Sequence, residues 1–285
     1  SNLDRGSGVT LRLRGDAGIG KTTLLDWVAA QTSAAVVRLT GSESDAELAY
    51  SGLSALAKAI RSLGINVPEQ HDAVLASAVG DGSTQGQLTV GGAALAALAA
   101  ASEHAPLVLL VDDAHWLDEP SCWALAFALR RLPDEPVVAI ITERSGMVSK
   151  FDNAGFETID IKGLDVDDAL AMLGPGTDRN VAQRCVDVAE GNPLALGELA
   201  RLLDDDQLAG RAPLPNALPV GNRLIPSFVD RINALDEGAK QALAVAAAAL
   251  DSTASDIRDA VDRFETGIAG LMAGDTAGIT RVSPD

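Results

Sequence analysis

Residues 9–25 read Val-Thr-Leu-Arg-Leu-Arg-Gly-Asp-Ala-Gly-Ile-Gly-Lys-Thr-Thr-Leu-Leu, and this stretch decides the fold. The alternation between Val9 and Arg14 predicts a β-strand. A glycine-rich turn follows, and the apolar residues of positions 24–29 recur at helical spacing. A strand, a glycine-rich turn and a helix in this order form the context that a phosphate-binding loop requires.

The turn matches the pattern G-x-x-x-x-G-K-T, and a second threonine follows it. Glycines let successive backbone N–H groups turn inward around a phosphate, and the helix adds its positive N-terminus. We expect Lys21 to reach the β- and γ-phosphates and Thr22 to ligate Mg²⁺. The predicted nucleotide-binding residues are Gly15, Ala17, Gly18, Ile19, Gly20, Lys21, Thr22 and Thr23. The alternative is a glycine-rich turn that binds nothing.

Two carboxylates end a later apolar run. Residues 107–111 predict a buried strand, and Asp112 and Asp113 follow directly. We expect Asp112 to order Mg²⁺ and its water. Asp113 would then lie beside the γ-phosphate, where a carboxylate can orient or deprotonate the attacking water. The alternative is that polar residues merely terminate a strand.

Further apolar runs predict the rest of the sheet. Residues 106–111, 137–142 and, more weakly, 158–161 suit strands buried on both faces of a parallel sheet. A short strand is expected at 35–40, and helices at 49–60 and 88–103 alternate with the strands. The predicted fold class is α/β, a doubly wound parallel sheet of the P-loop NTPase type over residues 1–162.

Strand patterns nearly vanish after Lys162. Helical patterns at 166–173, 179–190 and 194–203 predict a helical subdomain over residues 163–206. A charged and proline-rich stretch begins at Asp204, and we interpret residues 207–221 as a linker. Helical patterns at 225–235, 237–250 and 257–272, with a β-hairpin at 277–282, predict a third unit over residues 222–285.

Composition and charge exclude several functions. The chain of 285 residues has 22 basic and 40 acidic residues, a formal net charge of −18, and acidic residues exceed basic ones in both halves. A nucleic-acid-binding surface needs the opposite field, so we expect no direct nucleic-acid binding. No apolar run is long enough to cross a bilayer, so no membrane partner is expected.

The two cysteines and the first residues bear on location. Cys122 and Cys185 are far apart within amphipathic stretches, which favours buried thiols in a reducing compartment over a disulfide. Ser1 and Asn2 have no leader-like apolar run after them, and we interpret them as a cleavage scar. We therefore expect a cytoplasmic fragment.

A family resemblance becomes specific at residues 112–118. Asp-Asp-Ala-His-Trp-Leu-Asp, together with the glycine-rich loop, resembles the STAND-class NTPase core of large LuxR-family (LAL-type) transcriptional regulators. Thr142-Glu143-Arg144 and the segment Gly-Asn-Pro-Leu-Ala-Leu at 191–196 are similar to further family motifs. The resemblance implies that Arg144 senses the γ-phosphate, that Pro193 packs near the adenine, and that residues 222–285 begin a winged-helix domain.

Each implied role has a simpler alternative. Arg144 could be a solvated arginine after a strand. Residues 191–196 could be helix punctuation, in which a glycine closes one helix, Asn192 caps the next and Pro193 takes its first position. His115 has no second His or Cys at ligand spacing, so we expect a structural hydrogen-bonding group, and Trp116 is expected to serve packing.

The resemblance implies a switch that binds ATP or ADP with Mg²⁺ and hydrolyses slowly if at all. Its implied partners are the nucleotide, the downstream domains of the same polypeptide and, in a nucleotide-dependent way, a second copy. One alternative is a self-contained P-loop ATPase or kinase acting on a small substrate. Another is a scaffold that binds no nucleotide, because residues 1–8 lack the Gly-Arg-Glu type segment that helps family members to hold the base.

Overall fold

The computed structural model describes residues 8–81, 86–103, 105–215, 218, 232–249, 254–263, 267–277 and 279–280. The chain divides into two compact units, residues 1–163 and 164–285. Each unit is described by itself. Residues 1–7, in which the sequence shows no base-holding segment, lie outside the described part.

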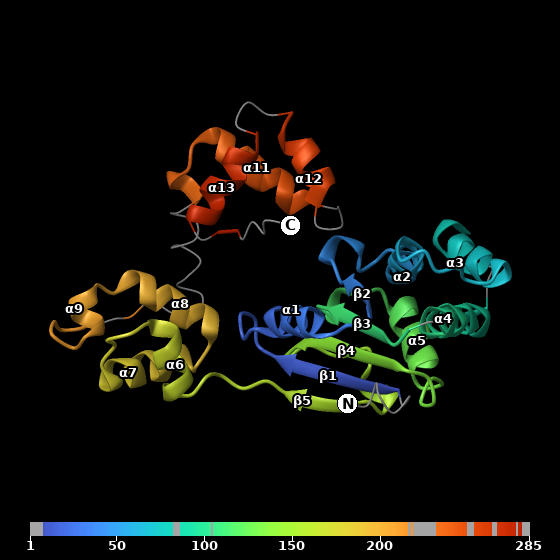
Figure 1. The fold of residues 1–285 in the computed structure, drawn as a ribbon, viewed down its shortest axis with the longest axis horizontal. Coiled ribbons are helices and arrows are strands. Elements are labelled where there is room, and N and C mark those ends of the chain that lie inside the picture. Colours follow the sequence, from blue (N-terminus) through green and yellow to red (C-terminus); the bar gives the residue numbers. More distant parts are fainter. Residues whose placement is uncertain are drawn as a thin grey trace. The chain divides into compact units, whose positions relative to one another are not determined.

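The first unit is built on a five-stranded parallel sheet. Its strands are β1 (Val9–Gly15), β2 (Ala35–Thr40), β3 (Leu107–Asp112), β4 (Val137–Arg144) and β5 (Glu157–Asp160). Their order is β2-β3-β4-β1-β5, as the labels in Figure 1 show. All neighbours run parallel, so the carboxyl ends of β3, β4 and β1 lie next to one another at one edge.

Helices cover both faces of the sheet. Alternate residues of β3 point to opposite sides, and all six are buried. Leu109 and Val111 pack in the larger core with α2 (Ser51–Ser62), α4 (Gln87–Ser102) and α5 (Glu119–Leu129). Val108 and Leu110 pack with Leu25 of α1 (Lys21–Gln31) in a smaller core. The predicted α/β P-loop NTPase fold is confirmed.

Most element predictions for this unit agree with the structure. Strand β2 has the predicted bounds, whereas β4 continues two residues further, to Arg144. Helix α3 (Glu69–Asp81) was not predicted, because among its described side chains only Leu75 is fully buried and the helical pattern is correspondingly sparse. The glycine-rich stretch of residues 80–86 overlaps the end of α3, and its residues 82–85 lie outside the described part.

The second unit begins with four helices: α6 (Val166–Leu173), α7 (Arg179–Ala189), α8 (Pro193–Leu202) and α9 (Asp205–Leu208). They share a core that contains Ala169, Cys185 and Leu196. The side chain at each N-cap accepts a backbone N–H of the first turn: Asp165, Asp178, Asn192 and Asp204. Asp204, at which the charged and proline-rich stretch begins, forms a capping box with Gln207 and so begins α9.

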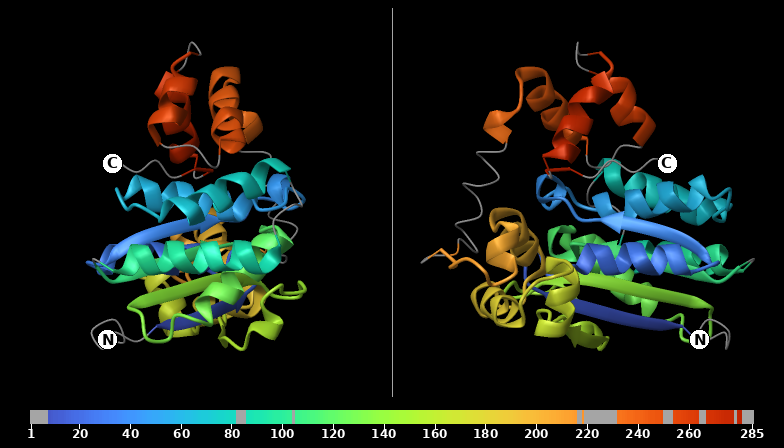
Figure 2. Two further views of the ribbon diagram at one scale, coloured as in Figure 1. Left: turned by 90° about the vertical axis from the view of Figure 1, so that its right-hand side faces the viewer. Right: turned by 60° about the vertical axis from the view of Figure 1, so that its left-hand side comes forward.

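Three further helices follow: α11 (Glu237–Ala248), α12 (Ala254–Val261) and α13 (Gly267–Thr276). They surround a small core of Ala242, Val261 and Leu271 and form a group drawn in orange to red in Figure 2. The pattern at 257–272 thus spans parts of two helices. Residues 278, 281 and 282 of the predicted hairpin at 277–282 lie outside the described part, and the N–H of Ile279 donates to the carbonyl of Gly274 at 2.9 Å.

The expectations about the two cysteines and about membrane-spanning segments can be compared with the structure. Both Cys122 and Cys185 are buried free thiols, as predicted. Within the described ranges, the search for a helix long and apolar enough to span a bilayer finds none.

Candidate functional site

The glycine-rich loop between β1 and α1 depends on backbone conformations that favour glycine. Gly18 and Gly20 have φ angles of 77° and 96°, in the left-handed region. A Cβ on Gly20 would meet nothing within 4 Å, so conformation and not crowding requires glycine there. At Gly15 the reason is packing, because a Cβ would lie 2.8 Å from Cγ2 of the buried Ile19.

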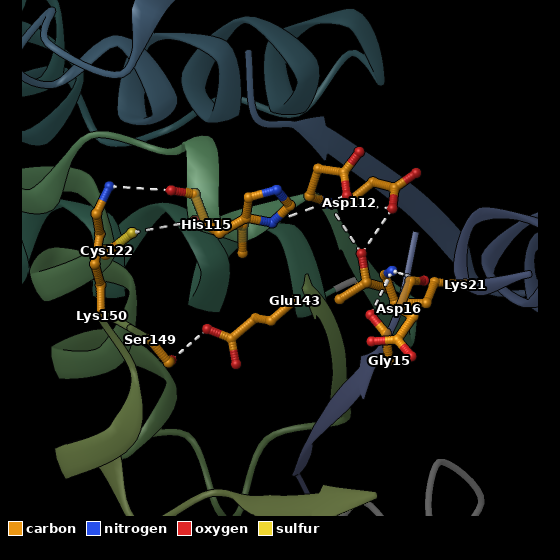
Figure 3. A network of polar contacts seen from close by, with 12 residues as sticks. Gly15, Asp16, Lys21, Asp112, His115, Cys122, Glu143, Ser149 and Lys150 are labelled. Carbon is orange, nitrogen blue, oxygen red and sulfur yellow. Dashed lines mark hydrogen bonds and ion pairs between the residues drawn. The ribbon is translucent and has the colours of Figure 1, made fainter. Parts of the chain in front are cut away.

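Lys21 begins α1 and is buried at 7% exposure. Its amine donates to the carbonyl oxygens of Gly15 and Asp16, both at 2.9 Å (Figure 3). Burial lowers the pKa of Lys21, while Asp113 and Asp112 oppose this shift. In the described part of the chain Lys21 forms no ion pair within 4.0 Å, and the two carbonyls hold its amine at the loop.

Asp112 is buried at the end of β3 and fixed by three donors. Its Oδ1 accepts the hydroxyl of Thr142 at 2.7 Å and the N–H of Asp113 at 3.1 Å. Its Oδ2 lies 3.3 Å from Nη2 of Arg38, which is also paired with Asp26. The sequence singled out Asp112 but missed Arg38, whose signal is one charged residue within the β-prone run of β2.

Asp113 takes a left-handed conformation, with φ 46° and ψ 46°. Its N–H also donates to the Thr142 hydroxyl at 2.9 Å, so the ends of β3 and β4 are tied together. Its side chain is 43% exposed at the edge where β1 ends in the glycine loop. A carboxylate held in this way can act on a ligand that occupies the loop.

The turn that carries Asp113 packs tightly on the end of β2. The N–H of Gly41 donates to the carbonyl of Asp112 at 2.9 Å. A Cβ on Gly41 would lie 2.3 Å from the carbonyl oxygen of Asp113 and 3.0 Å from the nitrogen of Leu117. Gly41 was not singled out from the sequence, because a lone glycine after a strand is ordinary turn punctuation.

His115 lies in the 3₁₀ turn of residues 114–116, with its side chain 4% exposed. Its Nδ1 is buried and has no hydrogen-bond partner in the described structure, and it lies 3.9 Å from Oδ1 of Asp113. The expectation of a satisfied structural hydrogen-bonding group was therefore wrong for this atom. The ring lies beside that of Trp116, with centroids 5.1 Å apart.

Asp118, the last residue of the motif, is a structural cap. Its Oδ1 accepts the N–H groups of Tyr50 and Ser121, both at 2.8 Å, and its Oδ2 accepts the N–H of Gly52 at 3.0 Å and the hydroxyl of Ser51 at 3.1 Å. The buried carboxylate thus serves the N-termini of both α2 and α5. Asp118 therefore ties the motif to the starts of these two helices.

The segment after β4 is tied to the same turn (Figure 3). The amine of Lys150 donates to the carbonyl of Leu117 and, at 3.4 Å, to that of His115. Ser149 donates to buried Glu143, which also accepts from Nε of Arg12 at 2.8 Å. Nothing in the sequence indicated Lys150, because its partners are backbone atoms more than thirty residues away.

Arg144 is the exposed last residue of β4 and pairs in register with Gly15. The carbonyl of Gly15 accepts the N–H of Ser145 at 3.1 Å as well as the Lys21 amine. Arg144 contributes electrostatically to the lowered pKa of both Lys21 and His115. The structure therefore brings Arg144 to the same edge as the loop and the two aspartates.

The remaining predicted residues of the loop lie in the first unit. Ala17 is exposed in the turn, and Thr22 and Thr23 are exposed in the first turn of α1.

Pro193 belongs to the second unit, where it takes the first position of α8. Asn192 caps this helix by accepting the N–H groups of Leu194 and Ala195, and Gly191 has a φ of 68°. The helix punctuation expected for residues 191–196 is thus present.

The donor set fits a magnesium nucleotide. Mg²⁺ keeps several waters and takes one or two protein carboxylates together with phosphate oxygens. Asp112 supplies a buried carboxylate and Thr22 an exposed hydroxyl, whereas the described residues contain no group of three or more His, Cys, Asp and Glu side chains suited to a metal. A cation at this site would therefore be shared with a phosphate ligand.

Comparisons with known proteins agree with this geometry. Residues 2–141 match the family model described as AAA ATPase domain. No curated protein matches the chain. The fold is similar to that of a STAND protein (Signal Transduction ATPase with Numerous Domains) with a tetratricopeptide repeat sensor from Pyrococcus horikoshii, with a TM-score of 0.52 and 16% identity. That match covers 95% of this chain but 37% of the other, so the chain spans little more than a third of its length.

Two other solved structures are more distant. A RuvB variant from Thermotoga maritima has a TM-score of 0.41 and 13% identity, over 97% of this chain and 82% of that one. Cdc6p from Pyrobaculum aerophilum has a TM-score of 0.43 and 15% identity, over 97% of this chain and 76% of that one. The match of residues 2–141 to the AAA ATPase domain model supports a nucleotide-binding NTPase region in this part of the chain.

Proposed function

We propose that this chain is the nucleotide switch of a larger signal-responsive transcriptional regulator of the LuxR family, one that binds ATP or ADP with Mg²⁺ and hydrolyses ATP slowly or not at all. The observation that carries the proposal is the convergence of Lys21, Asp112 and Arg144 at the ends of three neighbouring strands. This arrangement supports a site in which two cationic side chains and a metal-binding carboxylate would surround one phosphate tail.

Each residue has a distinct task in this proposal. The loop residues Gly15, Ala17, Gly18, Ile19, Gly20 and Thr23 surround the phosphates, while Lys21 donates to them after leaving the Gly15 and Asp16 carbonyls. Thr22 and Asp112 hold a Mg²⁺ that neutralises phosphate charge. Arg144 hydrogen-bonds the γ-phosphate without ever losing its charge. Asp113 accepts a hydrogen bond from the water beside that phosphate.

The switch acts through differential contacts. ATP and ADP differ by the γ-phosphate, so only residues that touch this group can bias one conformation over another. In the proposal these residues are Lys21, Asp113 and Arg144. Their contacts bias the packing of a helical subdomain (163–206), which supplies Pro193 near the adenine, and of a partial winged-helix domain (222–285) behind a linker (207–221).

The proposal extends to partners. The chain carries a formal net charge of −18, so DNA binding by the regulator belongs to other domains of the same polypeptide. Self-association with nucleotide bound is expected because a switch of this kind signals by exposing surfaces that the resting state covers. A cytoplasmic location follows from the use of ATP and from the two free thiols.

Calorimetry with MgADP and MgATP tests the proposal. Wild type is expected to bind both nucleotides. Lys21→Ala should bind at least about 100-fold more weakly, because a charge-assisted phosphate contact is worth about 3 kcal/mol. Lys58→Ala, which changes an exposed lysine on α2, is the matched control and should bind like wild type.

Turnover separates the proposal from its alternatives. We expect steady-state hydrolysis far below the median enzyme rate of about 10 per second. Brisk turnover without a partner would instead identify a self-contained ATPase or kinase. Flat calorimetric traces from folded wild type and Lys21→Ala alike would identify a scaffold that binds no nucleotide.

A further inference from the structure

The strongest unexplained feature of the site is Nδ1 of His115. The imidazole is 96% removed from solvent, and Nδ1 has no hydrogen-bond partner within the described residues. Buried polar atoms are almost always satisfied, so an orphaned one needs an explanation, and a partner that arrives in another state of the protein is one. The atom that Nδ1 faces is therefore informative.

That atom is Oδ1 of Asp113, at 3.9 Å. The gap is about 1 Å longer than an N–H···O hydrogen bond. The Asp113 side chain is 43% exposed, so it is the member of the pair that can move. Its backbone N–H is fixed by Asp112 and Thr142, so the movement is confined to the side chain. A small rotation of the carboxylate would close the gap.

His115, by contrast, is held in place. Its backbone carbonyl accepts from the Lys150 amine at 3.4 Å, and its imidazole ring lies beside that of Trp116. Burial lowers the pKa of His115, with Asp113 opposing and Lys21 and Arg144 reinforcing the shift. A neutral imidazole carries its proton on one nitrogen only, so the tautomer decides whether Nδ1 can donate.

We propose that His115 is a positioning residue for Asp113: its Nδ1–H donates to the Asp113 carboxylate when a γ-phosphate occupies the loop, and releases it in the ADP state. This inference rests on the proposed function, which places Asp113 beside the γ-phosphate. The hydrogen bond fixes one carboxylate oxygen, so the other faces the water and the phosphate. The γ-phosphate is thereby detected through Asp113, after the end of β3, as well as through Arg144, at the end of β4.

The tautomer of His115 can be observed directly. The chain contains three histidines, so ¹⁵N-imidazole labelling gives few resonances, and His115→Asn assigns those of His115. Spectra are compared for the free chain, with MgADP, and with MgADP plus beryllium fluoride, which mimics the γ-phosphate. We expect Nδ1 to become a protonated, pyrrole-type nitrogen only with beryllium fluoride, and this change to be lost in Asp113→Asn.

Two conservative variants provide a second readout. An asparagine amide occupies the place of Nδ1, whereas a glutamine amide reaches the place of Nε2. His115→Gln should bind MgADP within twofold of wild type but lose about 3- to 10-fold of its preference for a non-hydrolysable MgATP analogue. His115→Asn should retain the wild-type preference. Unchanged MgADP affinity also shows that each variant is folded.

Several results would overturn the inference and leave the proposed function intact. One is an Nδ1 resonance that is the same with MgADP and with beryllium fluoride, including a pyrrole-type signal already present in the free chain, as a buried water would produce. Another is equal preference in the Asn and Gln variants. If wild type binds neither nucleotide while folded, the proposed function fails and the inference fails with it.

Discussion

Nη2 of Arg38 lies 3.3 Å from Oδ2 of Asp112, the oxygen that Thr142 and Asp113 leave open. Arg38 comes from β2, next to the strand that Asp112 ends, and its guanidinium is also paired with Asp26. A cationic side chain thus occupies the neighbourhood in which the proposed Mg²⁺ would be bound. The arginine and the metal ion are competitors for one carboxylate oxygen.

We therefore predict that Arg38→Gln lowers the Mg²⁺ concentration that nucleotide binding requires. The Mg²⁺ concentration that gives half-maximal ADP binding should fall about two- to fivefold, since a partly exposed ion pair is worth about 0.2–1 kcal/mol. Titration of Mg²⁺ at fixed ADP measures this. Arg61→Gln, which breaks the exposed pair with Asp72, is the control. A higher Mg²⁺ requirement in Arg38→Gln would show that the arginine assists the site.

Gly41→Ala is predicted to damage the site through the backbone. The new methyl group would lie 2.3 Å from the Asp113 carbonyl oxygen, so the turn that carries Asp113 must shift. We expect a loss of about 1–3 kcal/mol in the free energy of unfolding, together with weaker nucleotide binding. Gly92→Ala is the control: a Cβ there meets nothing within 4 Å in helix α4, and the change should be neutral or stabilising. Equal melting temperatures for the two variants would contradict the prediction.

Asp118→Ala is predicted to be among the most destabilising substitutions of the motif. It removes the acceptor of three backbone N–H groups and a hydroxyl at the starts of two helices. We expect a loss of about 3 kcal/mol or more by denaturant unfolding. Asp118→Asn keeps one carbonyl oxygen and should lose about half as much. Loss of nucleotide binding without loss of stability would instead assign Asp118 to the ligand.

Lys150→Met tests whether the segment after β4 supports the turn of residues 113–118. The substitution keeps most of the length of the side chain but removes the donor to the His115 and Leu117 carbonyls. Faster hydrogen exchange is expected in residues 113–118, with a loss of about 1 kcal/mol in stability. Lys58→Met on α2 should change neither quantity. Unaltered hydrogen exchange in both variants would mean that the turn of residues 113–118 does not depend on Lys150.

The pH dependence of stability should carry a contribution from His115. Burial lowers its pKa in the folded chain below the ordinary value of 6.5, so the unfolded chain takes up the proton first as pH falls. The free energy of unfolding should therefore decrease as pH drops below 6.5. The contribution of His115 to this decrease should end once the pH is below its pKa in the folded chain. In His115→Asn this component should be missing. Parallel curves for wild type and variant between pH 7 and 5 would contradict the assignment.

Much of the first unit could be predicted from local patterns. Strand β2 has its predicted bounds, and β1, β3 and β5 agree within a residue or two, because β-prone and apolar runs bounded by turns are local signals. The glycine-rich loop could also be predicted, since the turn itself requires the left-handed backbone conformations of Gly18 and Gly20. Helix α3 was missed because its stability comes from packing on α4 and not from a clear periodicity.

By itself the sequence determined the chemistry of the site: a lysine after a glycine-rich turn, a carboxylate pair after a buried strand, and an arginine at the end of another. These are properties of short segments, and segments carry their turn and strand preferences wherever they lie. Only the tertiary structure decided which distant groups meet them. Insertion of β4 between β1 and β3 brings Thr142 to Asp112, and packing at that edge places Arg38 against the same carboxylate. Among the described residues, the same packing gives His115 Nδ1 no hydrogen-bond partner. Such contacts depend on register and packing across the sheet, which no short segment specifies.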